Sequence, residues 1–437
     1  MKNPQSKISV RGLLMYFKIT TFRTHFFDCF QNHTLMKSTV RFQLSLMMFL
    51  NFFIWGIWFV TMGTYLTKGS IAASDSQAGL AYGTQALGAI IAPFIMGLIA
   101  DKYFAAQKLL GLIHLAGAVL MYFIYQQSSF DSFYSLLLGY MIIFMPTLAL
   151  VNAIALKQMD SPEKQFSLVR VWGTIGWIVA GIFVGKILGL EQKAQLQQTF
   201  LISSGVSVVL GVLSFFLPNT PPPKAGTTTT VREILGLDAL ALLKDKNYLI
   251  FFLSSVLICI PLAFYYQETN KFLNELQVPE AAFKMSWGQM SETLFLFLMP
   301  LFFTRLGVKK MLLIGMLAWV IRYLCFDFGN ADSMAWLLYI GIILHGICYD
   351  FFFVTGQIYT DERAGERIRS SAQGMITLAT YGVGMLIGFW FAGMVTEHYK
   401  TADGHDWQKV WIIPAAFAGA VTVLFLIFFK DPKKQTA

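Results

Sequence analysis

Residues 248–266 read YLIFFLSSVLICIPLAFYY, an apolar run without a charged side chain. A helix rises about 1.5 Å per residue, so a run of this length crosses a hydrocarbon layer of about 30 Å. Similar runs recur along the 437 residues, of which 56% are hydrophobic and 13% charged. An average soluble domain has about 25% charged residues, so this composition argues against a soluble enzyme. The sequence predicts an all-α polytopic protein of the lipid bilayer.

The apolar runs predict twelve transmembrane helices in two groups of six. Their expected limits are 42–66, 76–100, 106–125, 133–156, 166–188, 198–217, 248–268, 284–303, 309–328, 333–358, 370–395 and 408–429. The first six form an N-terminal bundle over 42–217, and the last six a C-terminal bundle over 248–429.

Three polar segments flank or separate these bundles. Residues 218–247 begin PNTPPPKAG, which favours an extended linker, and their second part, 231–246, suits a helix on the cytoplasmic surface. Residues 430–437 form a cytoplasmic tail. Residues 1–41 form a cytoplasmic N-terminal segment, and 1–35 contain neither a span nor a regular signal peptide. Met36 directly precedes the first span, so we hypothesise that translation begins there and that 1–35 are not translated.

The distribution of charges argues against nucleic acid as a partner, and the cysteines and the missing nucleotide motif argue against a metal site and an ATP-driven motor. The formal net charge is +9, but the 33 Lys and Arg residues are scattered and form no stripe for nucleic acid. Most of them lie on one side if both termini are cytoplasmic, as the positive-inside rule requires. The four cysteines stand far apart, and there is no GxxxxGK[ST] motif. We expect no metal and no cofactor, with an ion gradient as the energy source.

Two segments at corresponding places of the halves are alike: MGLIADKYFAAQKLL at 96–110 and MPLFFTRLGVKKMLL at 299–313. Both follow the second helix of their half, as expected for two parallel six-helix repeats. Gly97, Asp101 and Lys102 also resemble a signature of the major facilitator superfamily, which implies that fold.

Ionisable residues inside spans cost about 2.5–3.5 kcal/mol on insertion scales, so they usually serve function. Glu292 lies near the middle of the eighth span, and Gln289 shares its helix face. We predict that they bind a polar ligand and that Glu292 carries a proton. The alternative is a protonated Glu292 bonded to a neighbouring helix.

Arg170, Thr174 and Trp177 are spaced i, i+4 and i+7, so they form one stripe on the fifth span that suits a polar ring compound. The alternative is that Arg170 only reaches the headgroups. Asp350 lies at a similar depth in the tenth span, and an ion pair with Arg170 would close the cytoplasmic side. Asp350 could instead neutralise Arg322.

Several motifs resemble the nucleoside:proton symporter family, the bacterial nucleoside permeases, over nearly everything from Met36 to Lys430. Among the most specific are RVWGTIG at 170–176, QMSETLF at 289–295, DFF at 350–352, SAQGM at 371–375 and DWQKVW at 406–411. The resemblance implies uptake of nucleosides with protons, by alternating access, across a bacterial inner membrane.

The resemblance also implies roles in binding or coupling for Arg170, Thr174, Gln289, Glu292 and Asp350. Trp177 and Tyr349 stand where the family has phenylalanine, and His345 where it has tyrosine, so the substrate range is open. The seventh span aligns weakly; Tyr266 and Gln267 are its candidates for substrate binding.

Other functions remain as alternatives at this level. Amides, a carboxylate and rings also suit a proton symporter for sugars or another polar metabolite. A third possibility is a sensor that binds nucleosides without transporting them. No nucleophile, base and orienting residue stand at a recognisable spacing, so we expect no enzyme. We expect a monomer.

Overall fold

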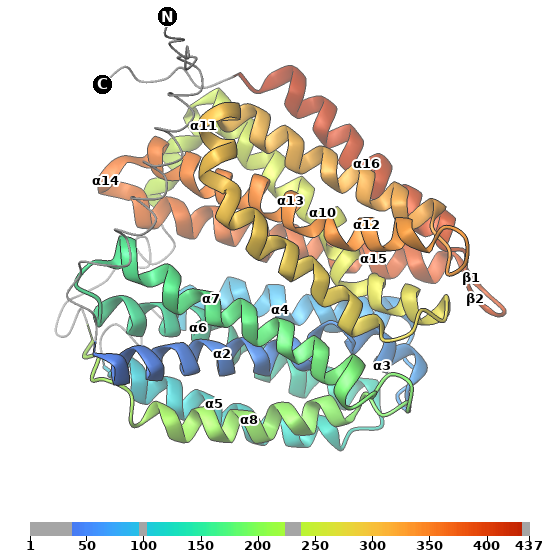
Figure 1. Cartoon of the computed structure of the whole chain (residues 1–437), viewed down its shortest axis with the longest axis horizontal. Helices are drawn as coiled ribbons and strands as arrows, with labels where there is room; N and C mark the ends of the chain where they lie inside the picture. Colours follow the sequence, from blue (N-terminus) through green and yellow to red (C-terminus); the bar gives the residue numbers. More distant parts are fainter. Residues whose placement is uncertain (1–36, 96–102, 223–236, 431–437) are drawn as a thin grey trace, which may run out of the picture.

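The computed structural model describes residues 37–95, 103–222 and 237–430, most of which are helical (Figure 1). Within this part of the chain, nine helices are long and apolar enough to cross a membrane. The prediction of a helical membrane protein is confirmed. The motif at 97–102, the proposed start at Met36 and most of the expected surface helix lie outside the described residues.

The first half agrees with the predicted spans within a few residues wherever it is described. Its helices are α2 (Ser38–Phe59), α3 (Met62–Lys68), α4 (Asp75–Ile95), α5 (Ala106–Tyr125), α6 (Phe130–Lys157), α7 (Pro162–Ile182), the π-helix η2 (Phe183–Ile187) and α8 (Gln198–Ser214). After it, η3 (Leu237–Lys244) is a 3₁₀-helix that packs against the second half.

The second half contains longer helices with internal breaks. Its elements are α10 (Lys246–Glu275), α11 (Ala281–Phe328), α12 (Ala335–Ile343), α13 (His345–Tyr349), η4 (Asp350–Val354), α14 (Thr355–Thr377), η5 (Leu378–Gly384), α15 (Met385–His398) and α16 (Trp407–Phe428). Between α15 and α16, β1 (Lys400–Thr401) and β2 (Gly404–His405) form a small hairpin.

Two glycines divide the long helices where the sequence predicts separate spans. Gly307 within α11 has φ 68° and Gly365 within α14 has φ 64°. Residues with a Cβ atom rarely adopt this left-handed backbone conformation, so glycine is the residue that permits the break. Each break falls between two predicted spans, 303–309 and 358–370 respectively.

The two halves form two bundles that lie side by side (Figure 1). They meet where α4 packs against α15 and η5, α7 against α11, and α3 against α10. A Cβ atom on Gly79 would lie 2.5 Å from the Phe389 carbonyl oxygen, so the α4 and α15 backbones touch. We call the end with β1 and β2 the hairpin end, and the end where α2 begins and α16 finishes the terminal end.

The contact between α2 and α7 is similarly close and gives a test of the packing. A Cβ atom on Gly176 would lie 2.2 Å from the Phe49 carbonyl oxygen. We therefore expect Gly176→Ala to lower the free energy of unfolding by about 1–3 kcal/mol, as overpacking does. The measurement is thermal unfolding of purified protein in detergent.

Gly139→Ala is the matched control, because a Cβ atom there meets nothing within 4 Å. It should be neutral or slightly stabilising, since alanine favours a helix. Equal destabilisation by both substitutions would contradict the assigned contact.

Candidate functional site

A cavity of about 270 Å³ lies between the two halves, slightly below the usual range of about 300–1,000 Å³ for ligand pockets. Both halves line it. Seven residues that the sequence singled out are among its walls: Arg170, Thr174, Trp177, Tyr266, Gln289, Glu292 and Tyr349. The structure thus brings together candidates from α7, α10, α11 and α13.

Two opposite charges face this cavity from different halves. The guanidinium of Arg170 lies over the Phe52 ring, 4.3 Å from its centroid, and interacts electrostatically with Glu292. The carboxylate of Glu292 lies 3.8 Å from Nε2 of His345. No carboxylate of the described residues lies within 4 Å of Arg170, so its donors remain available to a ligand.

Aromatic rings form much of the remaining wall. The Trp177 ring meets Trp55 edge to face, with centroids 5.2 Å apart. On the other side, His345 stacks on Tyr265 at 5.0 Å. The hydroxyl groups of Tyr349 and Tyr381 share a hydrogen bond. Flat apolar faces with a few polar groups at their edges are suited to a planar polar ligand.

Five polar side chains of the cavity were absent from the sequence-based site: Gln85, Asn152, His345, Thr377 and Tyr381. Asn152 could have been included, because an amide within a span needs a partner, and its Oδ1 has none among the described residues. His345 was noted only as a departure from the family. Its Nδ1 is likewise buried without a partner.

Of the two candidates on the seventh span, Tyr266 lines the cavity and Gln267 does not, which corrects the sequence-based assignment of Gln267. It is the residue after Tyr266, so its side chain points in a different direction around α10. Its Nε2 donates to Oε1 of Glu268 at 2.7 Å. Gln373, another amide within a span, bonds the carbonyl of Gln357 and the carboxylate of Asp361.

Asp350 lies beside the cavity, at the start of the π-helix η4, and is 1% exposed. No hydrogen bond or ion pair joins it to Arg170 in this conformation, so a gate made by this pair stays a prediction for another state. No ion pair joins Asp350 to its alternative partner, Arg322, either: Nε of Arg322 donates to the Gly341 carbonyl at 2.9 Å, and its guanidinium covers the Tyr265 ring.

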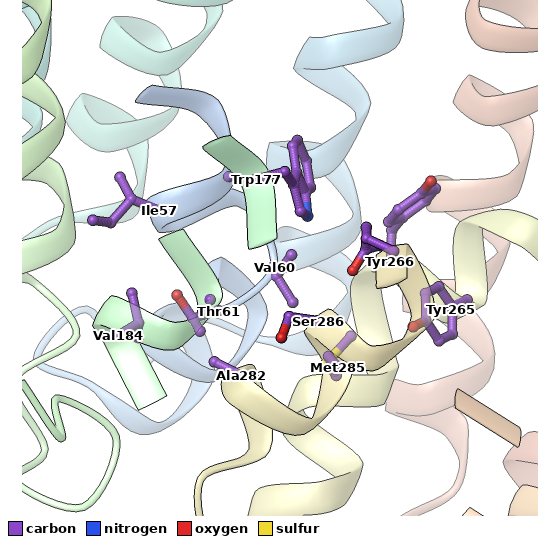
Figure 2. A pocket seen from close by; sticks show the side chains of 13 residues that line it. Ile57, Val60, Thr61, Trp177, Val184, Tyr265, Tyr266, Ala282, Met285 and Ser286 are labelled. Carbon is purple, nitrogen blue, oxygen red and sulfur yellow. The ribbon is translucent and has the colours of Figure 1, made fainter. Parts of the chain in front are cut away.

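Toward the hairpin end the cavity gives way to packed apolar side chains. Figure 2 shows side chains of α2, η2 and α11 converging there, with Trp177 of α7 and with Tyr265 and Tyr266 of α10 beside them. They leave about 10 Å³ of free space, room for about one water molecule. We call this layer, made by Ile57, Val60, Val184, Ala282 and Met285, the apolar seal.

Beyond the apolar seal, a group of charges ties the halves together, and we call it the hairpin-end network. Its members are Lys68 and Asp75 of the first half and Glu268, Lys271, Glu275 and His405 of the second. Lys271 binds both Asp75 and Glu268, and all three are at most 1% exposed. Buried charges of this kind are tolerated when they are paired.

A second set of polar contacts at the hairpin end involves Glu191, in the connection between η2 and α8. Its Oε1 accepts from Nδ2 of Asn270 at 2.8 Å and from Nδ2 of Asn274 at 3.1 Å. Its Oε2 accepts from the backbone N–H of Ala282 at 3.0 Å, at the start of α11. A carboxylate there complements the positive end of the helix dipole.

The sequence-based analysis missed these outer contacts. Lys271 follows Glu268 by three residues, and this spacing could have indicated a pair on one helix face. By contrast, Asp75 and His405 are 330 residues apart, and no local pattern connects them.

The halves are therefore joined asymmetrically. Among the described residues, every hydrogen bond and ion pair between the halves lies at the hairpin end. These contacts close the structure at the hairpin end.

The Glu191 contacts predict a local effect of mutation. In Glu191→Ala, the Ala282 N–H and both asparagine amides lose their shared acceptor, so the start of α11 should open more often. Amide hydrogen exchange in a peptide covering 281–286 should then be several-fold faster. Gln192→Ala, an exposed neighbour, is the control, and unchanged exchange in Glu191→Ala would contradict the role of this carboxylate.

Comparison with known proteins accounts for these features. The sequence profile of the nucleoside H⁺ symporter family matches residues 36–434. The putative nucleoside transporter YegT of Escherichia coli K12 is 42% identical over 411 residues, covering 92% of this chain and 96% of that protein. The xanthosine permease of the same strain is 32% identical, with coverage of 91% and 98%.

A solved structure agrees with these matches. The crystal structure of the nucleoside transporter NupG has a TM-score of 0.80 with this chain at 30% identity, covering 90% of this chain and 99% of the crystallised one. The resemblance indicated by the motifs of α7 and α11 is thus confirmed by sequence and by fold. The chain belongs to the nucleoside H⁺ symporter family of membrane transporters.

Proposed function

We propose that this chain imports nucleosides together with protons, by alternating access of one central cavity to the two sides of the membrane. The observation that carries the proposal is the cavity itself. In a chain of the nucleoside H⁺ symporter family, it sets Arg170 of one half opposite Glu292 of the other, between aromatic walls. Membership of this family also agrees with the expectation that the chain is not an enzyme.

The cavity has groups for each part of a nucleoside. Trp177 and Tyr349 offer ring faces against which a base can stack. Gln289 and Thr174 supply an amide and a hydroxyl, which can bond the polar edge of a base or a ribose hydroxyl. Because these groups lie on both halves, a bound nucleoside bridges them.

Glu292 is the group we propose for proton coupling. Its carboxylate is in the wall of the proposed cargo cavity, which Arg170 also lines. A proton on Glu292 removes one charge from a low-dielectric site, which makes movement of the loaded protein across the membrane less costly. Asp350, buried nearby with Oδ2 unpartnered, is the second candidate. No cofactor takes part, and the coupling ion is the proton.

The proposed topology places the hairpin end outside and the terminal end in the cytoplasm. Twelve spans then cross a bacterial inner membrane with both termini inside, and the chain acts as a monomer. The basic residues support this orientation: Arg41, Lys157, Lys246, Lys309 and Arg363 all lie near the terminal end. With the hairpin end closed, the structure represents an inward-facing state.

Uptake in cells tests this function directly. Transporter-deficient cells that express the chain should accumulate radiolabelled uridine or adenosine, and a protonophore should abolish the accumulation. Excess ribose and hexoses should not compete with the labelled nucleoside. If protein in the membrane takes up neither nucleoside, the cargo is another polar metabolite; competition by hexoses would indicate a sugar.

Glu292→Gln tests the coupling group. The glutamine keeps the shape and the hydrogen-bonding capacity of the side chain but cannot exchange a proton. Accumulation of uridine against its gradient should therefore fall to the level that the parent reaches in the presence of the protonophore. Exchange of uridine at equal concentrations should persist, because it needs no net proton movement. Asp403→Asn, at an exposed position of the hairpin, is the control. A Glu292→Gln protein that still concentrates uridine contradicts the proton role of Glu292.

A further inference from the structure

The hairpin-end network is outside the cavity, and the transport mechanism above does not use it. It contains three carboxylates and two lysine ammonium groups, besides His405. With a neutral histidine the network carries one net negative charge. With an imidazolium the charges balance. The Lys68 side chain is 50% exposed, but the side chains of the other five members are at most 12% exposed, so water screens an excess of charge there poorly.

The geometry of His405 also favours the charged ring. Its Nε2 lies 3.0 Å from Oδ2 of Asp75, and its Nδ1 lies 3.0 Å from both carboxylate oxygens of Glu275. A neutral imidazole has one donor and one lone pair, so one of its nitrogens would face a carboxylate without a proton. The imidazolium donates to both carboxylates. The histidine side chain is 3% exposed, so water does not replace either bond.

His405 links the two halves through these bonds. Asp75 starts α4 of the first half, whereas His405 and Glu275 belong to the second. The Asp75 carboxylate also binds Lys271, and the backbone N–H groups of Asp75 and Ser76 donate to Glu397. The proton on His405 therefore controls a hydrogen bond to Asp75, the residue of the first half that also contacts Lys271 and Glu397 of the second half.

Charged groups lie on the elements around His405. They are Lys68 of α3, Asp75 of α4, Glu268, Lys271 and Glu275 of α10, and Glu397 of α15, with Lys400, Asp403 and Asp406 on the hairpin and beside it. Of these, Asp75, Glu275 and Lys271 shift the pKa of His405. The Trp407 ring of α16 packs on the imidazole, with centroids 5.1 Å apart. Burial lowers the pKa of His405, but the hydrogen bonds to Asp75 and Glu275 outweigh it, and the pKa lies above its ordinary value.

We propose that His405 is a proton-operated latch: the imidazolium holds the hairpin end closed, and loss of its proton lets the halves separate there. Its place in transport rests on the proposed function, in which the hairpin end faces outside. The latch then closes the outer side in acid and loosens as the outside becomes alkaline.

The sign of the pH dependence follows from the two states of the latch. Once the hairpin end is open, His405 is in water with an ordinary pKa of about 6.5. Because the pKa in the closed state is higher, closure is fully stabilised below about pH 6.5. This stabilisation is lost as the pH rises through the raised pKa of the closed state.

Access to the apolar layer behind the latch can be measured with a thiol probe. Ser286 is 2% exposed and beside the apolar seal, so Ser286→Cys, in a chain with the four native cysteines replaced by alanine or serine, reports opening. A membrane-impermeant maleimide is applied from outside at pH 5.5 to 8.5. Rates are divided by those of Gln192→Cys, an exposed outer position, to remove the effect of thiol ionisation.

We expect the normalised labelling rate to rise roughly threefold or more with pH, since each unit of pKa shift allows a factor of about ten. His405→Gln should label fast at all pH values. His398→Gln, which removes an exposed histidine outside the network, should behave as the parent. Glu275→Gln, a milder change at a less buried position, should move the transition to lower pH.

A parent rate that does not depend on pH overturns the latch, and so does a His405→Gln protein with the same pH dependence as the parent. These results are separate from the proposed function, because labelling needs no nucleoside. Uridine uptake with pH-independent labelling would leave transport intact and the latch wrong. Failed uptake with pH-dependent labelling would leave the latch and remove the assigned cargo.

Discussion

The two halves of this chain are held together by polar contacts at one end only, as far as the structure describes them. At the hairpin end, Glu191 binds two asparagines and the start of α11, and Lys271 binds Asp75 across the junction. The central cavity lies between the halves, and residues of both line it. A transporter that exposes its site to one side at a time needs this kind of asymmetry, and it needs contacts that can be exchanged for others.

The cost of burying charge explains where the ionisable residues lie. Arg322 has a carbonyl acceptor and an aromatic face, and Lys271 has two carboxylates. By contrast, Arg170 and Glu292 face the cavity without a direct ion pair. Charges left in this way raise the energy of the empty protein. A polar ligand can pair with these charges and a proton can neutralise Glu292, so binding lowers this energy and is coupled to the conformational change.

Local patterns predict the helices and the cavity well. Apolar length fixes the spans, and helical spacing places Arg170, Thr174 and Trp177 on one face, as the structure has them. Gln267 does not line the cavity, because one residue along a helix changes the side-chain direction by about 100°, and the family motif is weakest there. Residues such as His345 and Asn152 line the cavity, but a single polar residue in a span indicates a partner without saying which one.

The hairpin-end network could not be predicted from local sequence. Its members come from three regions distant along the chain. The spacing of Glu268 and Lys271 indicates a local pair, but no single region indicates its partners in the other two. Only the fold puts Asp75 beside His405. Contacts of this kind depend on how two halves dock, and neither composition nor periodicity contains that information.

The most direct test of the central claim is coupled flux through the purified protein. In liposomes with a pH-sensitive dye inside, an inward gradient of uridine should acidify the lumen, because each transport cycle carries protons with the nucleoside. Ribose at the same concentration should have no effect. Uptake of uridine without any change in lumenal pH, under conditions where the dye detects added acid, would contradict proton symport.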